Sequence, residues 1–557
     1  MKFISTLFTL IFICCIKSQA QPAAVKQAAK SVFKLTTYKA DGTALAESNG
    51  IFVSEDGVAI STLKPFLGAA RATVTDIKGK QYDVVRILGA NEVYDMVKFK
   101  VDAEKRIPLV LAGVSVKAGD AAWLIPYEKS NVAQTSATVN KVEIFMDKYS
   151  YYIFNVQAND ALTACPFVNE KGEVIGLMKP ATTSDVTHAV DARFAFSLVT
   201  TGLSLNDPAL RQIDIPAALP QDKDQAQLAL LMAEQDADSI KLRATIDDFI
   251  ALFPRLVDGY SALARVQVKN NDIEEAAKTM ETAIKQVDNK DEAHAAYGQI
   301  IYNTLIYKGG NQYDKWTLER AADETNEAYA INPQPAYRHQ QALITYAKGD
   351  YEQAYTEFIK LLDTPIRNPE LFYEASQCKV MMKAPQTEII ALLDSAINNT
   401  DTLRMNTAAP YFYARAEAYN AADSFRQAVF DYTRYEILSG QRQNASFYLK
   451  RGQTEVKARL YQQALADMAM AIALEPKEPT YYAEMASLQL KVNLVDDAIQ
   501  TADRCVKLAP DYSDGYLILG LAMVNKGDIQ GGLSNLEKAK QLGNAQAQPL
   551  IDKYAKK

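Results

Sequence analysis

The C-terminal part of the chain repeats itself with a period of 34 residues. Small residues recur at this spacing, and so does one tyrosine. A period of this length, rich in small residues, indicates two antiparallel helices per repeat, with each repeat packing on its neighbours. A large part of the chain is therefore expected to be a helical solenoid. The equivalent positions are Tyr448, Tyr482 and Tyr516; Gly452, Ala486 and Gly520; Ala464, Ala498 and Gly532; and Ala471, Cys505 and Ala539.

This pattern resembles the tetratricopeptide repeat. In that repeat, small residues allow two helices to pack closely, and an aromatic residue fills the space toward the next repeat. Pro476 and Pro510 close two of the regular repeats, and looser copies extend upstream to about residue 225. We predict about eight repeats over residues 225–544 and a solubilising capping helix over residues 545–557.

The region before the repeats has a different pattern. Residues 28–205 contain short runs of alternating apolar and polar residues, separated by turns rich in Gly, Asp and Asn. Such runs are typical of antiparallel strands, and they suit a pair of six-stranded barrels. Residues 206–224 contain several prolines and lack helical periodicity, so we predict a linker there. The expected fold is an all-β double barrel followed by an all-α solenoid.

Three stretches of the β region resemble the active-site segments of trypsin-like serine proteases of the bacterial HtrA or Deg type. Residues 50–64 form a Gly-rich strand and turn that place Lys64 where the family has its catalytic His. Asp95, before a short apolar strand, matches the triad Asp. Residues 160–177 place Thr163 at the position of the nucleophilic Ser. The resemblance implies a trypsin-like fold in which two triad residues are replaced.

The triad needs an imidazole that accepts the proton of the Ser hydroxyl and a carboxylate that holds the ring. The three histidines of the chain, His188, His294 and His339, all lie far from position 64. The family's Gly two residues before the nucleophile falls on Ala161, whose Cβ disfavours the backbone geometry of an oxyanion hole. We therefore predict a pseudoprotease rather than an enzyme, with no cofactor and no metal site.

An alternative is an atypical peptidase in which Thr163 is the nucleophile and Lys64 the general base, since burial can lower the pKa of a lysine. A neighbouring Asp95 has the opposite effect, because its charge favours the protonated amine. We therefore interpret Lys64 and Asp95 as a structural ion pair. A purely structural subunit of an envelope assembly is the second alternative.

The first twenty residues have the features of a secretory signal peptide. Lys2 supplies a positive charge, residues 3–16 form an apolar run shorter than a membrane span, and residues 18–20 provide a small-x-small cleavage site. We predict cleavage after Ala20 and a periplasmic or secreted protein. No later segment approaches about 18 consecutive apolar residues, so no membrane span is expected. A net charge of −7 without a basic run argues against nucleic acid as a partner.

A solenoid of this type presents a concave surface formed by the first helix of each repeat. In the last three repeats this surface is apolar to neutral, and we predict that it binds a protein or peptide partner. Alternatively, its side chains pack against the barrels or a second copy, and the oligomeric state stays open. The expected function is an exported protein-interaction scaffold. The predicted binding residues are Leu449, Gln453, Val456, Ala483, Ser487, Leu490, Leu517, Leu521 and Val524.

Overall fold

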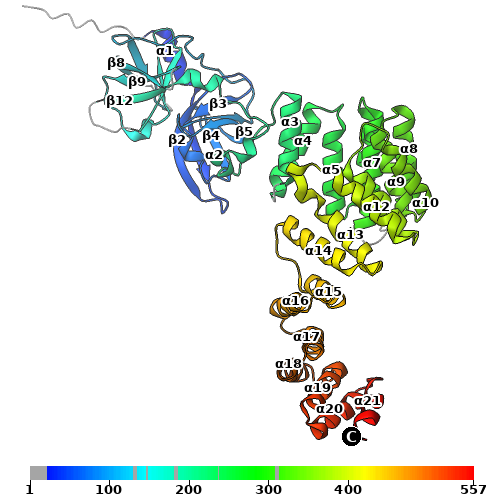
Figure 1. Cartoon of the computed structure of the whole chain (residues 1–557). Helices are drawn as coiled ribbons and strands as arrows, with labels where there is room; N and C mark the ends of the chain where they lie inside the picture. Colours follow the sequence, from blue (N-terminus) through cyan, green and yellow to red (C-terminus); the bar gives the residue numbers. More distant parts are fainter. Residues whose placement is uncertain are drawn as a thin grey trace, which may run out of the picture. The chain divides into compact units, whose positions relative to one another are not determined.

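The computed structural model divides into two compact units, residues 1–293 and 294–557. The first unit contains the β-strands and the first helices of the solenoid, and the second contains the later helices (Figure 1). The signal peptide predicted for residues 1–20 lies outside the described residues. The structure describes residues 22–128, 134–145, 148–180, 186–235, 238–307 and 313–556.

The first six strands form a closed antiparallel barrel in the order β1-β2-β3-β6-β5-β4. Alternation along each strand explains how the barrel is filled: in β6, Val97, Phe99 and Val101 are fully buried, whereas Lys98 and Lys100 are partly exposed. The strands are β1 (Val32–Tyr38), β2 (Ala44–Phe52), β3 (Val58–Ser61), β4 (Arg71–Thr75), β5 (Gln81–Asn91) and β6 (Met96–Val101).

The next six strands form a second closed barrel in the order β10-β11-β12-β9-β8-β7. Its core includes Phe154 and Phe167, whose rings stack with centroids 3.8 Å apart. Between the barrels, residues from both sides share one core, in which Tyr94 stacks on Phe194 at 3.6 Å. The predicted double barrel is therefore confirmed. The strands are β7 (Ala121–Leu124), β8 (Thr135–Phe145), β9 (Tyr149–Phe154), β10 (Pro166–Val168), β11 (Val174–Met178) and β12 (Thr187–Asp191).

The segment for which we predicted a linker is folded against the first barrel. It contains the short helix α2 (Pro208–Arg211), and Ile213 and Ile215 are buried in the core of that barrel. Beyond them the chain runs beside β5, where the Ile87 amide donates to the Pro216 carbonyl at 2.9 Å. Pro208 is the first residue of α2, where a proline is tolerated, and the later prolines are compatible with an extended segment beside a strand. The predicted linker is therefore an ordered connection that contains only a short helix.

Four helices of the solenoid belong to the first unit. They are α3 (Lys223–Gln235), α4 (Ser239–Leu252), α5 (Val257–Lys269) and α6 (Ile273–Gln286). The guanidinium of Arg86, on β5, forms two hydrogen bonds with the carboxylate of Asp248, on α4, at 2.8 and 2.9 Å. This planar, two-bond geometry is the strongest form of an Arg–carboxylate contact. It joins the first barrel to the first helices of the solenoid.

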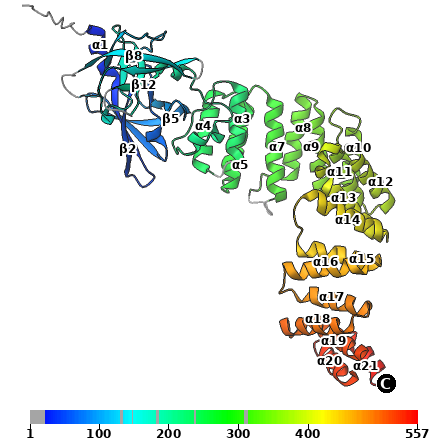
Figure 2. The same cartoon turned by 60° about the vertical axis from the view of Figure 1, so that its left-hand side comes forward.

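The remaining helices continue the solenoid, and successive helices pack as antiparallel pairs such as α15 with α16 and α17 with α18 (Figure 2). The predicted all-α solenoid is confirmed. The helices are α7 (Lys290–Tyr307), α8 (Leu318–Ile331), α9 (Pro335–Ala347), α10 (Tyr351–Leu361), α11 (Pro369–Met381), α12 (Gln386–Asn398), α13 (Ala409–Ala421), α14 (Phe425–Ser439), α15 (Ala445–Lys457), α16 (Tyr461–Leu474), α17 (Pro479–Lys491), α18 (Val495–Leu508), α19 (Ser513–Lys526), α20 (Ile529–Gln541) and α21 (Ala547–Tyr554).

Small residues lie where the paired helices approach most closely. Ala464 and Ala498 are fully buried, and a Cβ placed on Gly520 would lie 2.9 Å from the carbonyl oxygen of Gly532 on the facing helix. Among the described residues, seven turns between the helices of a pair also contain a residue with positive φ, a common way to end a helix. These residues are Asn271, Gly349, Lys383, Asp423, Arg459, Asn493 and Gly527.

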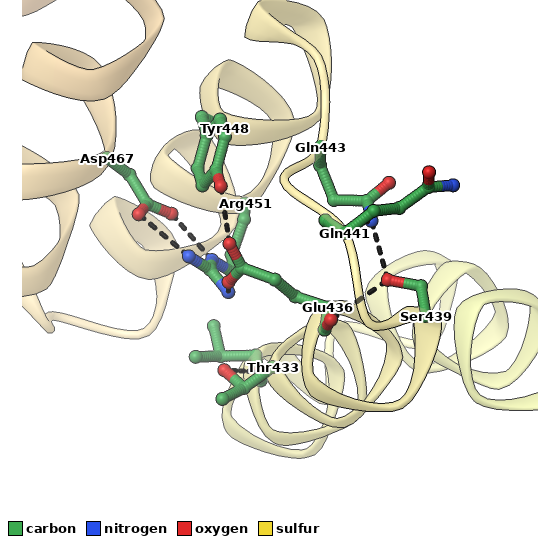
Figure 3. Close-up of polar contacts among 9 residues, drawn as sticks. Thr433, Glu436, Ser439, Gln441, Gln443, Tyr448, Arg451 and Asp467 are labelled. Atoms are coloured by element: carbon green, nitrogen blue, oxygen red, sulfur yellow. Dashed lines mark hydrogen bonds and ion pairs between the residues drawn. The ribbon is translucent and has the colours of Figure 1, made fainter. Parts of the chain in front are cut away.

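An arginine bridges neighbouring repeats at two places, buried at Arg451 and partly buried at Arg415. Arg451 on α15 donates two hydrogen bonds to Asp467 on α16, at 2.6 and 2.9 Å, and one to Glu436 on α14, at 2.7 Å (Figure 3). Arg415 on α13 bonds in the same way to Asp431 on α14 and Asp394 on α12. Each arginine thus connects the second helix of its own repeat to the second helix of the preceding repeat.

One carboxyl group near this network is buried without a hydrogen bond. Glu455, one turn after Arg451 on α15, is 4% exposed, and within the described residues its Oε2 atom has no hydrogen-bond partner. Burial raises the pKa of Glu455 to about 8, and the charge of Asp467 adds to the rise while that of Arg451 opposes it. The side chain is therefore mostly protonated in the folded protein at neutral pH.

Candidate functional site

The structure brings Lys64 and Asp95 together, but through the backbone. Lys64 begins a short 3₁₀-helix, η2 (Lys64–Phe66), and its amide nitrogen donates to Asp95 Oδ1 at 2.9 Å. Asp95 itself lies in the turn before β6 with φ of 47°, and it is 6% exposed. The carboxylate is thus held at the junction where the resemblance places the triad Asp.

The predicted ion pair between Lys64 and Asp95 is wrong. Both residues lie in the described part of the chain, and no ion pair joins their side chains there; the Lys64 side chain is exposed. The amine of Lys179, directly after β11, forms the ion pair with Asp95 instead. Burial lowers the pKa of Lys179, and the contact with Asp95 counteracts this effect. Asp95 is therefore neutralised by a residue of the second barrel.

Sequence reasoning missed Lys179. One signal was present, because this lysine directly follows the strand Val174–Met178, in which every residue is buried. A lysine at the end of such a strand requires a carboxylate or carbonyl partner, since an isolated buried ammonium is costly. The pattern did not reveal which carboxylate this is, because Asp95 lies 84 residues away in the chain.

In the loop that contains Thr163, backbone N–H groups donate hydrogen bonds to acceptors within the same loop. Residues Asp160–Leu162 form a 3₁₀-helix, η3, whose cap residue Asn159 accepts from the amide of Ala161 at 3.0 Å. The amide of Thr163 donates to the carbonyl of Asp160, also at 3.0 Å. By the resemblance, the amides of Ala161 and Thr163 are the two that would form the oxyanion hole, and both are occupied.

A residue of the first barrel holds the loop in this orientation. Asn49 on β2 is buried, and its Nδ2 donates to the carbonyls of Ala161 and Thr163, both at 2.9 Å. The loop therefore directs two carbonyl oxygens toward β2. An oxyanion hole requires preorganised N–H donors that point at the developing negative charge. The observed arrangement presents acceptors to β2 instead, and sequence reasoning did not anticipate the part that Asn49 takes in it.

The surface predicted to bind a partner is only partly exposed. Leu517 is 5% exposed and packs with Leu536 and Ile551, on α20 and α21. Val524 is 8% exposed, and its side chain fills the space that the missing side chain of Gly532 leaves on α20. Ala483 is also buried. The prediction is therefore wrong for Leu517, Val524 and Ala483, because α20, α21 and the neighbouring repeats already cover these positions.

The other predicted residues remain accessible to different degrees. Ser487 is exposed, and the rest of the set is partly exposed. Gln453 donates to Glu484 at 3.0 Å and so links the first helices of two successive repeats. Binding at this surface remains a prediction. The residues that stay accessible are Leu449, Gln453, Val456, Ser487, Leu490 and Leu521.

The described residues contain no group of three or more His, Cys, Asp or Glu side chains arranged to hold a metal ion, and no helix long and apolar enough to cross a membrane. The thiols of Cys165, Cys378 and Cys505 are free and buried. Burial raises the pKa of Cys165 to about 12, so its thiol is protonated and unreactive at neutral pH.

Comparison with known proteins finds two separate likenesses in sequence, and no protein-family model matches the chain. One is to serine protease HTRA1B of Danio rerio, 25% identical over 157 residues, which covers 26% of this chain and 33% of that protein. The other is to heat shock protein STI1 of Saccharomyces cerevisiae, 30% identical over 99 residues, 18% of this chain and 17% of that protein. The chain thus matches a third or less of each relative's length.

The Hsp70-Hsp90 organizing protein of Triticum aestivum is 28% identical over 88 residues, 16% of this chain and 15% of its own length. Among solved structures, the HtrA-type protease AlgW matches 33% of this chain and 62% of its own chain, with 17% identity and a TM-score of 0.28. The closed barrels and the sequence likenesses agree. The protein combines a trypsin-like double barrel, similar in sequence to part of an HtrA-type protease, with a helical solenoid that is similar in sequence to part of STI1.

Proposed function

We propose that this protein is an exported protein-interaction scaffold whose trypsin-like domain is catalytically inactive. The occupied backbone donors at Ala161 and Thr163 carry this proposal. A hydrolase of this fold stabilises the tetrahedral oxyanion with two free N–H groups, and losing one such donor typically slows turnover by about 100- to 1000-fold. With Lys64 and Thr163 at the positions of the His and Ser, the domain lacks both the proton acceptor and the usual nucleophile.

The alternative of a Thr163 peptidase with Lys64 as base receives less support. A lysine that acts as a general base is typically desolvated in an apolar pocket, whereas Lys64 is exposed. The partly buried lysine at this place is Lys179, and its amine is engaged by Asp95. Burial lowers the pKa of Lys179, but the charge of Asp95 opposes this effect and favours the protonated amine, which disfavours a role as proton acceptor for Thr163.

Hydrolysis assays on the chain from residue 21 test the inactive state. We expect no cleavage of unfolded casein and no labelling by a fluorophosphonate probe. The double variant Lys64→His with Thr163→Ser, which rebuilds the triad residues, is also expected to be inactive, because Asn49 and Asn159 still hold the loop and Lys179 still holds Asp95. Cleavage by the native chain that disappears in Thr163→Ala would overturn the proposal.

The binding role rests on the solenoid. Its likeness to STI1 and to the Hsp70-Hsp90 organizing protein supports a protein partner, and the accessible predicted residues make the contact in this proposal. The predicted signal peptide places the protein in the periplasm or outside the cell. We expect Leu449→Asp with Leu490→Asp to abolish capture of a partner from an envelope extract.

The matched control for this double variant is Gln463→Asp, an exposed change on the second helix of one of the same repeats. It should capture the partner as the native chain does, and both variants should keep the helical content. If the native chain captures only further copies of itself, the reading as a purely structural subunit replaces the scaffold.

A further inference from the structure

A pocket lies between the two barrels, beside the segment that connects them. Its volume is about 400 Å³. The walls come from five places: the turn between β2 and β3, the start of β3, strand β6, the inter-barrel connection, and the short 3₁₀-helix η4 (Ala192–Phe196). The lining is mainly apolar, with one cation. The lining residues are Val53, Ser54, Val58, Lys98, Pro108, Leu109, Val110, Leu111, Ala195 and Phe196.

Large apolar side chains on the rim of this pocket are exposed. Val110 is 65% exposed and Phe196 is 68% exposed, and nearby Ile107 in the same connection is 53% exposed. Single exposed apolar residues are ordinary, but several gathered around a concave lining are typical of a contact surface. Neither Val110 nor Phe196 is needed to fill a core, since both side chains lie mostly in solvent.

The one cation in the lining has no carboxylate partner. The amine of Lys98 donates to the carbonyls of Ala195 and Leu198, at 3.3 and 3.1 Å, and within the described residues no Asp or Glu lies at ion-pair distance from it. Burial lowers the pKa of Lys98 without a neighbouring charge to offset it. Two carbonyls occupy two of the three donors of an ammonium group, so one N–H remains for a further acceptor.

Lys100, two residues further on the same strand, shows the contrast. It pairs with the carboxylate of Asp56 at 2.5 Å. Both lysines point away from the interior of the barrel, because side chains two residues apart lie on the same face of a strand. Of these two lysines, Lys98 is therefore the one whose ammonium has no carboxylate partner among the described residues and can pair with a ligand.

We propose that this pocket is a second docking site, which takes a short extended segment of a partner protein with an apolar side chain and an adjacent carboxylate. The carboxylate would bond to Lys98, and the apolar side chain would pack between Val110 and Phe196. Charge complementarity favours an acidic group, because a carboxylate stabilises an unpaired, partly buried ammonium more strongly than a neutral acceptor does. The volume lies near the lower end for ligand pockets, so the occupant is a short segment rather than a folded domain.

The test uses the full chain from residue 21 and a displayed library of random heptapeptides. Peptides that also bind the variant Val110→Asp are removed by counter-selection, and the remainder belong to the pocket. We expect them to contain Asp or Glu, or a free carboxyl terminus, next to Leu or Phe. Replacing that carboxylate in a labelled peptide by its amide should weaken binding at least tenfold in fluorescence polarisation.

Three variants complete the test. Lys98→Met should weaken binding of the selected peptides at least tenfold, Lys98→Arg should retain it, and Lys100→Met should leave it unchanged. The solenoid variant Leu449→Asp with Leu490→Asp should also bind these peptides normally, which separates this site from the proposed function. Circular dichroism melts verify folding, and Val110→Asp, an exposed change, tests the pocket without touching the bonds of Lys98 to Ala195 and Leu198. Equal binding by Lys98→Met and the native chain, or a selection without acidic enrichment, overturns the proposal.

Discussion

The two regions of this protein bury charge in different ways. In the solenoid, Arg451 and Arg415 make the same set of bonds in two repeats, and each arginine finds its principal partner 16 residues further along the chain. In the trypsin-like domain, Asp95 is paired once, by Lys179 from the other barrel, 84 residues away. The solenoid thus repeats one Arg–Asp pair between residues that are close in sequence, whereas the barrels depend on an ion pair between residues that only the tertiary fold brings together. Substitutions at these groups can break or sharpen this comparison.

The largest loss of stability is expected from Arg451→Met. The change leaves the carboxylates of Asp467 and Glu436 without their cation. Removing one partner of a buried ion pair lowers the free energy of unfolding by up to about 5 kcal/mol. Urea unfolding followed by circular dichroism measures it. Lys457→Met, an exposed change on the same helix, is the control and should match the native chain. A loss no larger than that of the control would mean that the repeated arginine is not a bridge.

A smaller loss is expected from Lys179→Met. Asp95 then lacks its cation but keeps the amide of Lys64 as a donor, so we expect about 3 kcal/mol. The exposed change Lys171→Met in the same barrel is the control. Unfolding of the barrels is followed by the fluorescence of Trp123, which lies in their shared core. If Lys179→Met destabilised the domain more than Arg451→Met destabilises the solenoid, the order of the comparison would be reversed.

The third effect depends on pH. The pKa of Glu455 is raised to about 8 in the folded protein from an ordinary value of 4.5, so between these values the folded state binds more protons than the unfolded state. Stability is therefore lost as the pH rises through this window. Glu455→Gln does not titrate, so its free energy of unfolding should equal that of the native chain at pH 4 and exceed it increasingly up to pH 9.

Urea unfolding at several pH values measures the effect of Glu455→Gln. Asp511→Asn, an exposed change in the turn before α19, serves as the control. A constant difference between Glu455→Gln and the native chain across this range would show that the pKa of Glu455 is the same in the folded and the unfolded protein.

The smallest effect is expected from Lys64→Ala. The side chain is exposed, and its amide, which the substitution keeps, makes the contact with Asp95. Surface changes of this kind usually alter stability by no more than about 0.5 kcal/mol. A loss as large as that of Lys179→Met would restore the ion pair that the sequence suggested.

Packing positions could be predicted well from the sequence. Ala464, Ala498 and Gly520 were recognised by their period, and all three lie at close helix contacts, because a repeat must place the same small residues at the same contact each time. Surface positions were predicted less well. Leu517 follows the same period as Leu449, which is partly exposed, but α20 and α21 cover Leu517. Periodicity assigns a face of a helix, and it does not indicate what lies opposite that face.

The site shows the same division. Lys64, Asp95 and Thr163 were found by resemblance, since each lies in a short motif that can be aligned. The contacts of Asn49 and Lys179 were not found, because each joins segments that are distant in sequence. The sequence by itself determined the two classes of fold, because local patterns of apolar and small residues specify both. That Lys64 and Thr163 replace triad residues stays a prediction from the resemblance. Only the tertiary structure decided which lysine neutralises Asp95 and which way the Thr163 loop faces, because the packing of one barrel against the other sets both.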